Sequence, residues 1–217
     1  LLPAYHCRTI VESVLHVGAE VRFYPMTKDL RPDFANMDAL VSDGKASAFL
    51  MTHYFGFANA LGQAKAYCER NRVAFIEDCA HAFYGEQDGK ALGSVGDYAI
   101  ASAWKFLPVW DGAMLRDNTA SSKKAGLTPQ PLAEEIKSMR ALVKAWLEGK
   151  RPTPAFQAPD AATLVTRAAE IHAGKSNLLK EEPSGFRAEL VGVSGSRVSR
   201  WAVLNSNAIA KETPAAP

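Results

Sequence analysis

The chain has 217 residues, of which 47% are hydrophobic, so it is long enough to bury the core of a domain. Its 25 Lys and Arg residues nearly balance 23 Asp and Glu residues, and the net charge of +2 argues against nucleic acid or an anionic membrane as a partner. No apolar run approaches the roughly 20 residues that span a bilayer, and the three cysteines follow no disulfide or metal-ligand spacing, which indicates a reducing, cytoplasmic setting.

Helical patterns recur along the first half of the chain. Apolar residues at helical spacing predict a helix over residues 8–17, and Gly18 suits its exit. A short helix is predicted over 34–41, and a longer one, rich in Ala, Gln, Lys and Glu, over 59–70.

Extended, mostly apolar segments lie between these helices, at residues 21–24, 48–52, 73–76, 98–102 and 113–115. Several are apolar on both faces, which is typical of strands covered on both sides. Such strands alternating with helices predict an α/β fold, a three-layer, mostly parallel sheet with helices on both faces.

The pattern changes after Asn118. We predict a core domain over residues 1–118, a polar linker over 119–130 and a helical segment over 131–217 that leads toward a C-terminal domain. The segment opens with an amphipathic helix over 131–149, and a further helix is expected to start at Asp160. One face of the first helix carries Leu132, Ile136, Met139, Val143 and Trp146.

Polar residues follow directly on several predicted strands, namely His53, Asp78 and Lys105. Ligands of α/β sheets bind beyond the carboxyl ends of the strands, which is where these side chains are expected. Pyridoxal 5'-phosphate needs a lysine amine for its aldehyde, a carboxylate to keep its ring nitrogen protonated and hydroxyl donors for its phosphate. Lys105, Asp78 and Ser102 are the candidates for these three tasks.

Four segments occur in an order that resembles a known family. They are His53-Tyr54-Phe55-Gly56, Glu77-Asp78-Cys79-Ala80-His81, Gly93-Ser94-Val95-Gly96-Asp97 and Ser102-Ala103-Trp104-Lys105-Phe106-Leu107-Pro108. Residues 2–118 thereby resemble the middle of the DegT/DnrJ/StrS-type sugar aminotransferases. The resemblance implies that the core domain is part of the pyridoxal-phosphate-binding large domain of fold type I.

The resemblance also implies roles for single residues. Lys105 is expected to be the Schiff-base lysine and proton shuttle, Asp78 the partner of the ring nitrogen and Ser102 a phosphate ligand. His81 occupies the place of a glutamine that contacts the phenolic side of the ring, where an imidazole also donates a hydrogen bond.

The sequence departs from the family at a few positions. Trp110 and Ala113 stand where Pro and Gly are usual, and Cys7 stands where an aromatic often stacks on the ring. The family's glycine-containing phosphate loop normally lies upstream of Leu1 and its C-terminal domain downstream, so we interpret the chain as a fragment.

The expected activity is transfer of an amino group from an amino acid to a keto sugar, which the family resemblance implies is nucleotide-linked, in a full-length homodimer. Two alternatives stay open. One is a sugar dehydratase that uses the same cofactor; such relatives commonly replace the lysine by histidine, and the presence of Lys105 disfavours it. The other is a non-catalytic sugar-nucleotide-binding or regulatory homologue, which the changes at Trp110 and Ala113 would fit.

Overall fold

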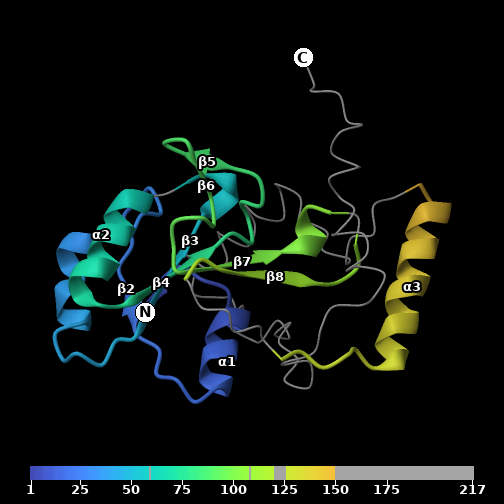
Figure 1. Cartoon of the computed structure of the whole chain (residues 1–217), viewed down its shortest axis with the longest axis horizontal. Helices are drawn as coiled ribbons and strands as arrows, with labels where there is room; N and C mark the ends of the chain where they lie inside the picture. The colour runs from blue at the N-terminus through green and yellow to red at the C-terminus, as the bar shows by residue number, and fades with distance from the viewer. Residues whose placement is uncertain (59, 108, 120–125, 150–217) are drawn as a thin grey trace, which may run out of the picture.

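The computed structural model describes residues 1–58, 60–107, 109–119 and 126–149 (Figure 1). Its main sheet has four strands in the order β3-β4-β7-β8. They are β3 (Ala48–Thr52), β4 (Ala74–Asp78), β7 (Tyr98–Ser102) and β8 (Ala113–Asp117). β3, β4 and β7 run parallel and β8 pairs antiparallel with β7, so the predicted α/β fold with a mostly parallel sheet is confirmed.

Two small strand pairs flank the main sheet. β1 (Leu2–Pro3) pairs in parallel with β2 (Phe23–Tyr24). The strand predicted over 21–24 is therefore formed in its second half, at residues 23 and 24. β5 (Glu86–Gln87) and β6 (Lys90–Ala91) form an antiparallel hairpin before β7.

Helices cover both faces of the main sheet, as predicted. α2 (Leu61–Asn71) packs on one face, where its buried Leu61, Ala64, Tyr67 and Cys68 join Phe49, Met51 and Phe75 of the strands in the main core. α1 (Arg8–His16) lies over the opposite face, where its Val14 lines a cavity with Leu50 and Ile76. The two helices are well separated in Figure 1.

The predicted short helix over 34–41 is two 3₁₀ turns, η1 (Phe34–Asn36) and η2 (Asp38–Leu40). Met37 lies between them and is fully buried in the main core. Its carbonyl accepts a 3₁₀ hydrogen bond from the Leu40 amide at 2.9 Å and a second bond from the Tyr67 hydroxyl at 3.2 Å.

The amphipathic helix predicted after the linker is α3 (Leu132–Leu147), with Pro131 at its N-cap. Its buried Ser138 donates a hydrogen bond to Asp111 at 2.5 Å. The predicted apolar face is exposed, with Trp146 79% accessible. Residues 160–174 and the rest of the predicted C-terminal segment lie outside the described residues. Among the helices that are described, none is both long and apolar enough to cross a membrane.

Candidate functional site

The carboxyl ends of β3, β4 and β7 open into one cavity of about 530 Å³. Thr52, Asp78 and Ile100 lie abreast on these strands and point to the face covered by α1. The cavity brings together the four residues predicted as the site, Asp78, His81, Ser102 and Lys105. It is also lined by residues that the sequence did not single out for this site, among them His6, Thr9, Thr52 and Tyr54.

Asp78 is the buried anion of this cavity, with only 3% of its surface exposed. Its Oδ1 accepts a hydrogen bond from the Ala80 amide at 2.9 Å, and its Oδ2 accepts one from the Thr52 hydroxyl at 3.2 Å. His6 Nε2 lies 3.8 Å from the same Oδ2. A buried carboxylate with so few donors attracts a cationic or N–H-bearing group into the cavity.

Lys105 is carried by a 3₁₀ turn, η4 (Ala103–Lys105), that begins where β7 ends. Buried Ala103 and Leu107 anchor the turn, and the Ala103 amide donates to the Gly112 carbonyl at 3.1 Å. The Lys105 side chain itself is exposed and lines the cavity, with Nζ 5.8 Å from the centre of the Trp104 ring. The amine is therefore carried on a fixed backbone and is accessible from the cavity.

His81 lies at the rim of the cavity on the turn that follows β4. Its ring stacks on Phe55, with the ring centres 6.0 Å apart and the planes 18° apart. Partial burial, with a further contribution from the positive charge of Lys105, lowers the pKa of His81. The imidazole is thus favoured in its neutral form, with one N–H donor and one acceptor.

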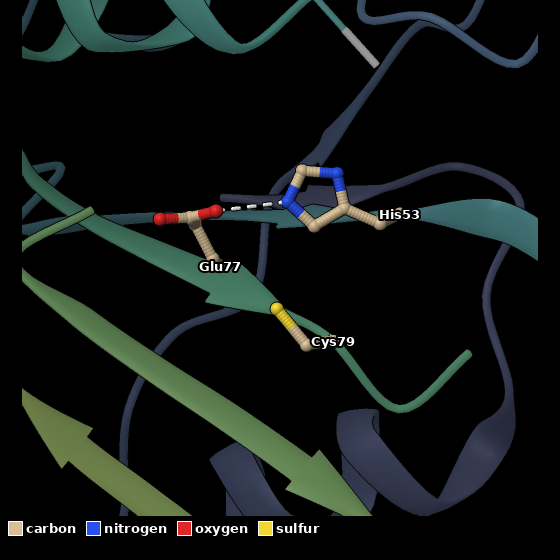
Figure 2. A group of neighbouring side chains, drawn as sticks. All are labelled: His53, Glu77 and Cys79. Atoms are coloured by element: carbon tan, nitrogen blue, oxygen red, sulfur yellow. Dashed lines mark hydrogen bonds and ion pairs between the residues drawn. The ribbon is translucent and has the colours of Figure 1, made fainter. Parts of the chain in front are cut away.

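Glu77, next to Asp78 on β4, is a buried carboxylate on the opposite face of the sheet. It accepts hydrogen bonds from the Gly93, Val95 and Gly96 amides at 2.8, 2.8 and 2.6 Å. His53 Nε2 donates a fourth hydrogen bond to it at 2.9 Å (Figure 2). Burial raises the pKa of Glu77, but the bonds from His53 and the three amides outweigh this effect and leave the pKa lowered. Glu77 thereby fixes the loop that leads into β7 and the site.

His53, Glu77 and Cys79 form a cluster whose candidate ligand atoms lie within 4.8 Å of one another (Figure 2). Both oxygens of Glu77 already accept hydrogen bonds. Burial raises the pKa of the Cys79 thiol to about 12, so the thiolate that a metal requires is disfavoured. This donor set favours a hydrogen-bonded support over a metal centre.

His53 was expected beside Asp78 and Lys105 because it follows a strand, but it does not line their cavity. Its ring is fully buried and bonds Glu77 on the α2 side of the sheet. The alternation of side chains along β3 explains the difference, since His53 continues the series of Phe49 and Met51, which point into the main core. The same alternation places Thr52 with Asp78 and is the signal that finds Thr52 from sequence.

Residues 1–125 match the model of the DegT/DnrJ/EryC1/StrS aminotransferase family. Among solved structures, the chain is similar to a DegT DnrJ EryC1 StrS aminotransferase from Brucella abortus, with 21% identity over 79% of this chain and 47% of that one and a TM-score of 0.49. It is also similar to Helicobacter pylori PseC, an aminotransferase involved in the biosynthesis of pseudoaminic acid, with 17% identity over 56% of this chain and 35% of that one and a TM-score of 0.47. The chain spans less than half the length of these two structures.

Proposed function

Because the chain belongs to the DegT/DnrJ/EryC1/StrS aminotransferase family, we propose that it carries the cofactor site of a pyridoxal-phosphate-dependent aminotransferase. The proposed reaction transfers an amino group from an amino acid to a keto sugar. The observation that supports it most directly is the cavity shared by a buried carboxylate, Asp78, and an accessible lysine, Lys105.

The residues of the cavity fit pyridoxal phosphate chemically. Asp78 is buried, and within the described part of the chain its Oδ2 accepts a hydrogen bond only from the Thr52 hydroxyl, at a long 3.2 Å, which suits a protonated ring nitrogen. Lys105 supplies the amine for the aldehyde, and Ser102 supplies a hydroxyl for the phosphate. A cavity of about 530 Å³ is within the usual range for small-molecule sites.

Bound pyridoxal phosphate supplies an aldehyde and a ring that accepts electrons. In the proposed mechanism, Asp78 holds a proton at the ring nitrogen through its buried carboxylate, because a charged acceptor favours the charged form of its partner. With the cofactor bound, the amine of Lys105 would be the group that accepts the α-proton of the amino donor and gives it back during the transfer. His81, held neutral beside Lys105, donates a hydrogen bond to the phenolic oxygen of the ring.

The test is covalent labelling of the whole chain. The protein is mixed with pyridoxal phosphate, reduced with borohydride and digested, and the modified peptide is identified by mass spectrometry. We expect one dominant label on Lys105, which Lys105→Ala removes and Lys90→Ala, a change of an exposed lysine on β6, leaves in place. A label of equal yield in Lys105→Ala would contradict the proposed site.

A second measurement separates the aminotransferase from the non-catalytic alternative. The wild-type chain carrying pyridoxal phosphate, without borohydride treatment, is mixed with an amino-acid donor in a single turnover, and conversion of the cofactor to its amine form is followed by absorbance. Conversion supports an aminotransferase. Labelling of Lys105 without conversion by any of the common amino donors would contradict it and favour a protein that only binds.

A further inference from the structure

On the α1 side of the cavity, the side chain of His6 is almost as buried as that of Asp78. It lies on the turn between β1 and α1, and its side chain is only 5% exposed. The turn is held from two sides, because the Ala4 amide donates to the Tyr24 carbonyl at 3.0 Å and the Tyr54 hydroxyl donates to the Tyr5 carbonyl. His6 is therefore presented to the cavity by a fixed backbone.

The contacts of the His6 ring define its donor and acceptor. Nδ1 lies 3.1 Å from the Cys7 carbonyl, and a carbonyl only accepts, so Nδ1 carries a proton. In the neutral ring Nε2 is then an acceptor. Nε2 lies 3.4 Å from the Thr52 hydroxyl and 3.8 Å from Asp78 Oδ2.

The Thr52 hydroxyl has a single proton and, besides the neighbouring Tyr54 hydroxyl, two acceptors within reach. One is Asp78 Oδ2 at 3.2 Å and the other is His6 Nε2 at 3.4 Å. When the proton points to His6, Asp78 Oδ2 is open to another donor and Thr52 is still paired. Without His6, Asp78 is the one of these two acceptors that is left for the Thr52 hydroxyl. A second donor that binds Asp78 Oδ2 then competes with Thr52, and one of the two donors is left with a poor hydrogen bond.

We propose that His6 is a positioning residue for Asp78 and acts through the Thr52 hydroxyl, an inference that rests on the proposed function of the cavity. A neutral His6 accepts the hydrogen bond of the Thr52 hydroxyl and leaves Asp78 Oδ2 for the ring nitrogen of pyridoxal phosphate. A doubly protonated His6 donates from Nε2, turns the Thr52 proton onto Asp78 and adds a positive charge beside it. Cofactor binding is therefore weaker when His6 carries the second proton.

Other titratable groups line the same cavity, namely Cys7, Tyr54, Asp78, His81 and Lys105. The test must isolate His6 from them. His6→Gln keeps a neutral acceptor for Thr52 at every pH, whereas His6→Leu fills space without one. Thr52→Val removes the hydroxyl and keeps its shape. His16→Leu, at the exposed end of α1, is the matched control.

The measurement is the dissociation constant of pyridoxal phosphate for the whole chain, from the absorbance of the bound cofactor, with thermal unfolding to establish that each variant folds. We expect His6→Leu to weaken binding about five- to tenfold at about pH 8 and His6→Gln to restore most of the loss. The double variant His6→Leu/Thr52→Val should bind no more weakly than Thr52→Val alone.

The outcomes separate this inference from the function on which it rests. If the wild type gives no borohydride-dependent label on Lys105, the proposed function and this inference both fall. If the label forms but His6→Leu binds as tightly as the wild type, or at least as tightly as His6→Gln, only the role of His6 is wrong. Additive losses in the double variant would overturn the route through Thr52.

Discussion

Replacing Glu77 by glutamine probes the hydrogen-bond network that holds the loop before β7. One oxygen of Glu77 accepts from the Val95 and Gly96 amides, and the other accepts from His53 and the Gly93 amide. A glutamine has one oxygen for one pair, and its NH₂ group faces the N–H donors of the other pair. Because Glu77 is fully buried, water does not replace the lost partners.

The loss of unfolding free energy in Glu77→Gln is set by the more favourable of the two orientations of the glutamine amide. With the NH₂ group toward His53, the imidazole can shift its proton to Nδ1, which has no partner among the described residues. The Gly93 amide then also loses its acceptor. One buried unpaired N–H costs about 1–3 kcal/mol, and the conversion of charge-assisted bonds to neutral ones adds about 1–2 kcal/mol. We expect Glu77→Gln to lower the free energy of unfolding by about 2–5 kcal/mol.

The pH dependence gives an independent signature. The folded pKa of Glu77 is lowered, so folding favours its charged form. Its stabilisation is therefore fully present above the unfolded pKa of about 4.3 and is lost as the pH falls through the folded pKa. The gap in unfolding free energy between wild type and Glu77→Gln should be largest near neutral pH and should narrow on acidification.

Urea unfolding followed by tryptophan fluorescence at several pH values measures both quantities. Glu86→Gln, at an exposed position of β5, is the matched control and should change the unfolding free energy by less than about 0.5 kcal/mol. A loss below about 1 kcal/mol in Glu77→Gln, or a gap that stays constant down to acidic pH, would refute the argument.

Three further predictions address single residues. Asp78→Asn should keep the borohydride-dependent label on Lys105 but slow the half-reaction about a hundredfold in stopped-flow absorbance, because an amide does not stabilise a protonated ring nitrogen; an unchanged rate would contradict this. The NMR titration of His81 should give a pKa below that of a free histidine, and Lys105→Met should raise it by removing a nearby positive charge; a further fall would contradict the sign. Gly96→Ala should destabilise the fold by about 1–3 kcal/mol in urea unfolding, because its Cβ would lie 3.0 Å from the Phe75 and Tyr98 carbonyl oxygens; wild-type stability would show that the loop yields.

Much of the sheet was predictable because its strands are short apolar runs bounded by polar residues. The ranges 48–52 and 98–102 were predicted with the bounds that the structure has, and the helix over 8–17 ends only one residue earlier. The break at Met37 was not predictable, because Met37 is buried there in the main core and bonds Tyr67, thirty residues away in the chain. Local patterns do not contain such long-range partners.

The site was predictable in its membership and less so in its detail. The family pattern led to Asp78, His81, Ser102 and Lys105, which do line one cavity, while their roles remain predictions. His6 was missed because it lies on a turn, where neither helical nor strand periodicity indicates which way a side chain points.

The two adjacent carboxylates of β4 restrict the register of this strand in the sheet. Glu77 requires the three amides of residues 93–96, and Asp78 requires the cavity under α1. A slip of β4 by one residue would exchange their faces, leaving the shorter aspartate to reach the amides and placing a longer, charged glutamate in the cavity. A chain with this register shift would lose both the hydrogen bonds that fix residues 93–96 and the ligand site. Misaligned molecules would therefore be both unstable and inactive.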